Sequence, residues 1–192
     1  MDVTDAEAKR FLERIISRDE RAITELHARI GKRIFAFALN RLHDHEEAAT
    51  VVSDVLLELW KQPHRFNGNC KFMTWVLGIA RYKMLHAYRD RVPDHDELDE
   101  AQASDSPDGF AVLAGKQQRE GLLRLMDELT PDHREALYLM YFEELSVEQV
   151  ARIQSCPVGT VKTRLFHARR RLRELIDRGG SARYGWPGEQ AA

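Results

Sequence analysis

SVEQVARIQSCPVGTVKTRLFHARRRLR, residues 146–173, is the stretch that decides the fold, because it predicts two short helices joined by a tight turn. Ser146 and Gln149 have the spacing of a capping box at the start of the first helix. Gln154-Ser155-Cys156 forms the turn, and Pro157 suits the first position of the second helix, where no amide hydrogen is needed. The second helix carries one apolar stripe at spacings of three and four: Val158, Val161, Leu165, Ala168, Leu172 and Leu175.

The other face of this second helix is polar and basic. No Asp or Glu occurs from Pro157 to Arg173, whereas a helix that is merely solvated usually mixes charges of both signs. Small and hydroxylated residues in its first turns would permit close approach to a base edge or a phosphate. A helix-turn-helix that reads the major groove is therefore favoured over an ordinary helical hairpin. The residues of this face are Thr160, Lys162, Thr163, Arg164, His167, Arg170 and Arg171.

Local charge, and not net charge, must support DNA binding in this chain. Its 192 residues carry a formal net charge of −2 and suffice for one large or two small domains. Between Val92 and Gly115 there is no Lys or Arg, and seven residues are acidic: Asp94, Asp96, Glu97, Asp99, Glu100, Asp105 and Asp108. This asymmetry predicts a flexible acidic linker between two modules that both meet a polyanion.

Helical periodicity dominates the remaining sequence. Asp19 caps an amphipathic helix, and a second helix is expected from about Asp44 to Lys61, stopping near Pro63. A further helix is expected over residues 72–91. Strand-like alternation is absent, so the predicted fold is all-α, with two small helical domains and a helix-turn-helix in the second. The predicted boundaries are residues 1–91 for the first domain, 92–109 for the linker, 110–178 for the second domain and 179–192 for a flexible tail.

Several classes of protein are disfavoured by the composition. Cys70 and Cys156, the only cysteines, fall in different predicted domains, so neither a disulfide nor a zinc site is expected. The N-terminus is polar and acidic, unlike a signal peptide, and no apolar run is long enough to span a membrane. We therefore expect a soluble, cytoplasmic protein with no metal, no cofactor and no direct membrane insertion.

Two sequence features suggest alternative functions. His43-Asp44-His45-Glu46-Glu47 suggests a metal-dependent phosphohydrolase, but neighbouring residues at a helix start point in different directions, and an acidic first turn favoured by the helix dipole explains them more simply. A stand-alone helix-turn-helix regulator would share the C-terminal motif. It would normally need a dimer interface and paired half-sites, and nothing in the N-terminal half resembles a ligand domain.

The order of two longer blocks around the acidic stretch carries a family resemblance. VLLELWKQPHRFNGNCKFMTWVLGIARYKMLHAYRDR begins at residue 55, and LTPDHREALYLMYFEELSVEQVARIQSCPVGTVKTRLFHARRRLRELI begins at residue 129. Together they resemble the extracytoplasmic-function (ECF) group of bacterial RNA polymerase sigma factors, over about residues 11–176. The resemblance implies a transcription initiation factor, not an enzyme, with no small-molecule substrate. It would bind core RNA polymerase and promoter DNA, help open the −10 region, and be held inactive by an anti-sigma factor.

The resemblance also implies roles for residues of the N-terminal domain. The core polymerase would contact Ser53, Asp54, Leu57 and Glu58, although Ala49, Thr50 and Ser53 stand where the family is usually acidic or amide-bearing. The −10 element would meet Phe66, Asn67, Asn69, Lys71, Arg81, Tyr82 and Lys83. Tyr82 and Gly78 replace a common asparagine and a common arginine of the family, and Phe72 and Trp75 are expected in the core.

In the C-terminal domain the family pattern places Lys162, Thr163, Arg164, Phe166 and His167 against the −35 element. Arg170 and Arg171 resemble phosphate contacts, which add affinity without sequence information. Bidentate pairing of Arg164 with guanine would be worth about 1–3 kcal/mol of discrimination. Phe166 either meets a thymine methyl or a sugar, or covers the neighbouring helix.

Overall fold

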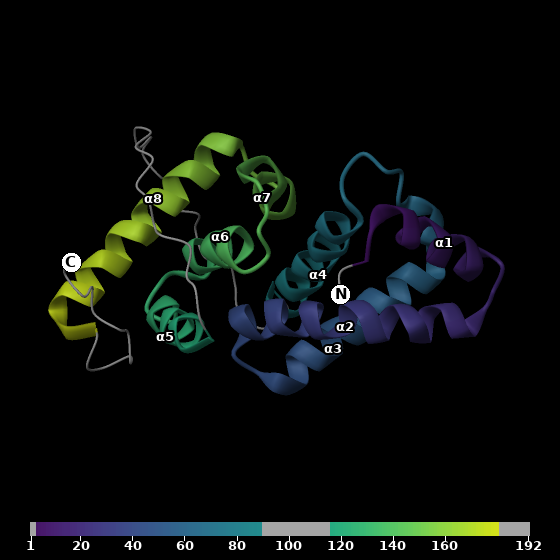
Figure 1. The fold of residues 1–192 in the computed structure, drawn as a ribbon, viewed down its shortest axis with the longest axis horizontal. Coiled ribbons are helices and arrows are strands. Elements are labelled where there is room, and N and C mark those ends of the chain that lie inside the picture. The colour runs from purple at the N-terminus through teal and green to yellow at the C-terminus, as the bar shows by residue number, and fades with distance from the viewer. Residues whose placement is uncertain (1–2, 90–115, 181–192) are drawn as a thin grey trace. The chain divides into compact units, whose positions relative to one another are not determined.

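The computed structural model describes residues 3–89 and 116–180, which form two compact helical units (Figure 1). The units are described separately. Within the described ranges every regular element is helical, which confirms the predicted all-α class. None of these helices is long and apolar enough to cross a membrane.

The first unit is built around α2 (Glu20–Leu42), which packs against α1 (Asp5–Ile16), α3 (His45–Lys61) and α4 (Phe72–Arg89). A short 3-10 turn, η1 (Pro63–Arg65), follows α3 and packs against α1. The core is a row of apolar side chains, all less than 2% exposed, that includes Leu26, Ile30, Ile34, Phe37, Leu59, Phe72 and Leu77.

Local caps set the helix boundaries of this unit. Thr4 and Glu7 form a capping box at α1, and the Asp19 side chain accepts from the Arg21 amide at α2. Asp44 accepts from the amides of Glu46 and Glu47 at 2.8 and 2.9 Å and so starts α3. This carboxylate, which the hydrolase alternative would use as a metal ligand, is thus engaged in capping. The described residues hold no group of three His, Cys, Asp or Glu suited to a metal ion.

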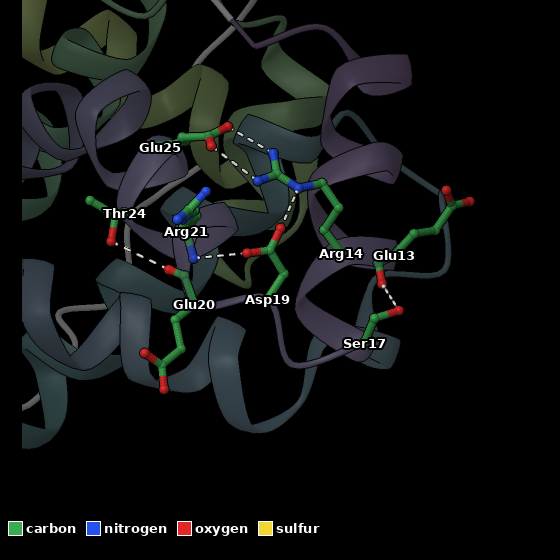
Figure 2. A network of polar contacts seen from close by, with 8 residues as sticks. All are labelled: Glu13, Arg14, Ser17, Asp19, Glu20, Arg21, Thr24 and Glu25. Atoms are coloured by element: carbon green, nitrogen blue, oxygen red, sulfur yellow. Dashed lines mark hydrogen bonds and ion pairs between the residues drawn. The ribbon is translucent and has the colours of Figure 1, made fainter.

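A polar network joins α1 to the start of α2 (Figure 2). Arg14 Nε lies 2.8 Å from Asp19 Oδ2, and its two Nη atoms donate to Glu25 at 2.7 and 3.0 Å. These hydrogen bonds lower the pKa of the Asp19 and Glu25 carboxyls. The same hydrogen bonds, to Glu25 and Asp19, raise the pKa of the Arg14 guanidinium. The side chains of this network are largely solvent-exposed, so its net contribution to stability is small.

The second unit contains α5 (Lys116–Met126), α6 (Pro131–Tyr141), α7 (Val147–Gln154) and α8 (Val158–Leu175), followed by the π-helical turn η2 (Ile176–Gly180). Helices α5 and α6 both pack against α8. The buried Arg134 of α6 donates to the carbonyls of Met126, Asp127 and Leu129 at 3.0–3.1 Å. The guanidinium of Arg134 thereby finds hydrogen-bond acceptors although it is buried. The same bonds provide donors for carbonyls at and after the C-terminus of α5, where helical carbonyls have no partner within the helix.

The structure corrects three details of the sequence analysis. Pro157 is the N-cap of α8, not its first helical residue, because its ψ of 151° is extended and the helix begins at Val158. Val158 is 36% exposed, so the buried stripe begins at Val161. Trp75 is half-buried, unlike Phe72, which is fully buried as expected. The predicted linker, Phe110 and residues 181–192 of the predicted tail lie outside the described residues.

Candidate nucleic-acid interface

The predicted capping box of the helix-turn-helix is present. The Ser146 amide donates to Gln149 Oε1 at 2.9 Å, and the Gln149 amide donates to Ser146 Oγ at 3.3 Å. A hydrogen bond from the Ser146 side chain also lowers the pKa of Glu148. Ser155 turns the chain with a φ of 52°, in the left-handed region. The capping box thus starts α7, and Ser155 reverses the chain between α7 and α8.

Helix α8 presents an exposed row of three of the predicted DNA-binding residues. Lys162, Phe166 and Arg170 are exposed and four residues apart, so they share one face. The Phe166 ring lies edge-on to His167 at 5.4 Å and is 38% exposed. Thr160, His167 and Arg171 are half-buried beside this row. Gly159 precedes it, and a Cβ added there would meet nothing within 4 Å.

Arg164 and Thr163 do not share this exposed face, contrary to the sequence prediction. Both are buried, and the side chain of Arg164 is only 9% exposed. Arg164 Nη2 lies 2.8 Å from Asp132 Oδ2 of α6, and its Nη1 donates to Cys156 Sγ at 3.8 Å. Arg164 therefore ties α8 to α6 and to the turn. The helical period predicted the apolar stripe of α8, but it did not show that the polar residues beside this stripe, Thr163 and Arg164, are buried as well.

The remaining arginines of α8 have different surroundings. Arg169, which the sequence analysis did not single out, donates to Tyr141 Oη at 3.2 Å and lies over its ring. Arg170 and Arg171 lie 3.9 and 3.3 Å from Glu174, with side chains 62% and 42% exposed. Exposed ion pairs of this kind are worth about 0–1 kcal/mol, so they do not prevent contact with a phosphate.

In the first unit, the residues between η1 and α4 form an ordered loop. Phe66 is half-buried, with its ring 5.5 Å from Phe72 and 5.3 Å from Trp75. Asn67 Oδ1 accepts from the Asn69 amide at 3.0 Å, and Gly68 between them has a φ of 75°, where glycine is favoured. Lys71 is exposed at the end of the loop. These predicted −10 residues therefore do lie together.

The three predicted −10 residues on α4 differ in accessibility. Tyr82 is 58% exposed, and its ring lies 4.3 Å from that of His86. Arg81 and Lys83 are half-buried. Lys83 Nζ is 3.5 Å from Glu58 Oε2, and Arg65 donates to the other oxygen of Glu58 at 2.9 Å. Glu58 and Lys83, which the sequence analysis gave to different partners, are thus joined.

Helix α3 carries the residues expected to meet the polymerase. Ser53 and Leu57 are exposed one turn apart, with Leu57 46% exposed, and Asp54 is half-buried. The Ser53 hydroxyl donates to the Ala49 carbonyl at 3.1 Å. Leu57 is the large apolar side chain that this face offers, with acidic Asp54 beside it.

Two carboxylates that support these surfaces were missed by the sequence analysis. Asp132 pairs with Arg164, and Asp5 Oδ1 of α1 accepts from the Phe72 amide of α4 at 2.8 Å. Phe72 lies 67 positions from Asp5 along the chain. Both contacts join different helices, so neither helical period nor local capping spacing could have indicated them.

Comparisons with known proteins agree with this division into two units. Residues 26–92 match the family model for sigma-70 region 2, and residues 119–172 match that for sigma-70 region 4. The chain is 30% identical over 189 residues to the RNA polymerase sigma-H factor of Pseudomonas aeruginosa, covering 92% of this chain and 95% of the relative. It is 28% identical over 178 residues to the ECF RNA polymerase sigma-E factor of Escherichia coli, covering 87% and 91%.

Solved structures show the same fold. The sigma factor RpoE of Bartonella quintana, crystallised with the anti-sigma factor NepR, matches with a TM-score of 0.58 and 25% identity, covering 80% of this chain and 96% of that one. CnrH, solved with the cytosolic domain of CnrY, matches with a TM-score of 0.62 and 21% identity, covering 88% and 96%.

Two sigma regions in order, on two helical units, define a sigma factor of the compact two-region kind. The chain belongs to the ECF group of the sigma-70 family. It is a non-enzymatic transcription initiation factor that binds core RNA polymerase and directs it to promoters. The family prediction and its function are confirmed, and the stand-alone regulator and the phosphohydrolase are set aside.

Proposed function

We propose a division of this activity between the two units. The first domain, residues 1–91, binds core polymerase and captures the −10 element. The second, residues 110–178, reads the −35 element, with residues 92–109 as an acidic linker and 179–192 as a tail. The order of regions 2 and 4 in the chain supports this division.

The −35 element is read by the exposed row of α8, Lys162, Phe166 and Arg170, with Thr160, His167 and Arg171 at its edges. The observation that carries this proposal is an exposed row on a helix without acidic residues up to Arg173. A lysine, an aromatic ring and an arginine on one face can meet a base edge, a thymine methyl and a phosphate. Arg164 and Thr163 act from behind this face by holding α8 in place.

The −10 element is captured by residues 66–71, which we name the −10 loop. An unstacked base needs an aromatic or amide surface, and stacking on an aromatic side chain is worth about 1–3 kcal/mol per base. Phe66, Asn67 and Asn69 provide such groups on a loop ordered by its own Asx turn. The adjoining DNA strand is bound by the last residue of the loop and by side chains of α4: Lys71, Arg81, Tyr82 and Lys83.

The core polymerase is bound by the α3 face that includes Ser53, Asp54, Leu57 and Glu58. An exposed leucine supplies apolar area, and the half-buried Asp54 beside it supplies charge for a basic partner. Glu58 contributes through its pairing with Lys83 and Arg65, which connects the polymerase face to α4.

Run-off transcription on genomic DNA fragments, with purified core polymerase and with or without the chain, tests the assignment. New discrete start sites are expected, lost with Lys162→Ala or Phe166→Ala in α8 and with Phe66→Ala in the −10 loop. Arg124→Ala is the matched control, because it removes an exposed cation of the second unit outside α8. Loss of transcription with the control as well, or retention with both α8 variants, would refute the α8 assignment.

We also propose that the chain works in the cytoplasm, where its polymerase is, and that an anti-sigma factor holds it inactive. The Bartonella quintana relative was solved with such a partner. The test is to co-express the tagged chain with candidate partners from its own genome and add each purified complex to the run-off assay. A partner that binds stoichiometrically and abolishes the new start sites supports the proposal, and partners that bind without inhibition contradict it.

A further inference from the structure

The residue that precedes α4 cannot cap this helix through its side chain. The helix begins at Phe72, and the residue before it is Lys71, whose side chain has no hydrogen-bond acceptor. The first turn of α4 contains no acidic residue. Amide groups at a helix start need an acceptor from outside the helix, and negative charge there is favourable. Neither Lys71 nor an acidic residue of the first turn can therefore supply the acceptor for the Phe72 amide.

Asp5 supplies that carboxylate from another helix. Its Oδ1 accepts from the Phe72 amide at 2.8 Å, in a partly buried contact. Asp5 also lies in the first turn of α1, which Thr4 caps. A single carboxylate thus serves the N-termini of two helices, α1 and α4, and ties them together.

The contact lies at one end of the −10 loop, and α1 also holds the other end. Helix α1 packs against η1, which immediately precedes Phe66. The Phe66 ring packs on Phe72 and Trp75, the residues at the start of α4. A shift of Phe72 would therefore move the stacking surface of the loop as well as its exit.

We infer that Asp5 is a positioning residue for promoter opening, which holds the −10 loop in its base-capturing form by capping α4. The inference rests on the proposed −10 function of this loop. Loss of the carboxylate leaves the Phe72 amide without its acceptor and frees the junction of loop and helix. The polymerase face on α3 is not part of this contact.

The test compares three variants as holoenzymes: Asp5→Ala, Asp5→Asn and Glu13→Ala. Asn retains a side-chain oxygen and caps helices about as well as Asp. Glu13 is an exposed carboxylate of the same helix, and its removal is the control. The probe is a duplex fragment that supports run-off transcription, carrying 2-aminopurine in its −10 element. Asp5→Ala should slow the rise in fluorescence about fivefold, the effect of losing one cap, while the other two variants stay near wild type.

A spectroscopic readout separates positioning from general instability. With Trp60→Phe and Trp186→Phe as background, Trp75 reports on the junction, and its emission should change in Asp5→Ala and return in Asp5→Asn. Core affinity should be unchanged in all variants. Equal losses of core affinity and opening, or an opening rate unaffected by Asp5→Ala, would overturn the inference. Phe66→Ala separates a failure of this inference from a failure of the proposed −10 function. Normal opening in Phe66→Ala would show that the −10 loop does not capture the −10 element.

Discussion

Arg164 is a buried cation of the second unit, and its surroundings determine what it does there. Its guanidinium lies 2.8 Å from Asp132, and the Arg164 side chain is 9% exposed. To pair with a guanine, Arg164 would have to break this ion pair and leave the Asp132 carboxylate behind in a partly desolvated site. Breaking such an ion pair costs free energy. Its position favours a structural role in the orientation of α8.

We predict that Arg164→Ala lowers the free energy of unfolding by about 2 kcal/mol, because a charged hydrogen bond is lost and Asp132 remains without it. Promoter affinity should fall by a similar factor for every −35 sequence. Thermal unfolding and competition with DNA carrying single −35 substitutions measure the two effects. Unchanged stability with relaxed preference at one base pair would instead show that Arg164 reads a base. That is the behaviour expected of Lys162→Ala.

Two glycines provide a second comparison at this scale. Gly78 in α4 and Gly159 in α8 are both helical, and an added Cβ would meet nothing within 4 Å at either position. Gly78→Ala should therefore stabilise the chain by about 0.5–1 kcal/mol, since alanine favours the helix. Gly159→Ala should not destabilise the chain but should weaken promoter binding, because the proposed −35 face would bring DNA close to this backbone. Urea unfolding and promoter binding by both variants check this, and equal promoter affinity would show that DNA stays away from Gly159.

At the scale of helices, local chemistry was readable from the sequence and contacts between helices were not. Asp19 and Ser146 each cap a helix through an amide two or three positions away, as predicted, and the helix expected from about Asp44 begins at His45 with Asp44 as its cap. The caps supplied by Asp5 and Arg134 act between helices and left no local pattern. The exposed face of α8 was predicted too wide for the same reason, because the ion pair of Arg164 is supplied by α6.

The network between α1 and α2 predicts a dependence of stability on acid. Asp19 and Glu25 have pKa values below their ordinary range because Arg14 donates to them. A lowered folded-state pKa adds stability above the unfolded-state value, near 4, and this stability is lost as the pH falls through the folded-state pKa. The melting temperature of Arg14→Ala should thus be lower than that of the wild type near neutral pH, and the two should converge in acid as the pH falls through the lowered folded-state pKa values of Asp19 and Glu25.

Arg10→Ala is the control for this pH dependence, because Arg10 is an exposed arginine of the same helix. Its melting temperature should follow that of the wild type at every pH. High salt should also shrink the effect of Arg14→Ala, since the network is exposed. A constant difference between Arg14→Ala and wild type across the acid range would show that Arg14 acts through its aliphatic contacts.

At the scale of the whole molecule, charge is distributed unevenly along the chain. The chain has a net charge of −2, yet the face of α8 is basic and the sequence between the units is acidic. Acidic residues near a basic surface lower its affinity for a polyanion within a screening distance of about 10 Å at 0.1 M salt. The free chain should consequently bind duplex DNA weakly, and specific binding should require the polymerase to engage both units.

We predict that neutralising the acidic sequence between the units, by Asp→Asn and Glu→Gln at Asp94, Asp96, Glu97, Asp99 and Glu100, strengthens the binding of the free chain to non-promoter duplex. The gain should fall steeply with salt, because phosphate neutralisation releases counterions. Run-off start sites should stay the same, since no base-reading residue changes. Fluorescence anisotropy over a salt series measures the first effect. A variant with the same residues in permuted order should behave as wild type. If the permuted variant gains as much affinity as the neutralised one, the order of these residues, and not their charge, keeps the free chain off DNA.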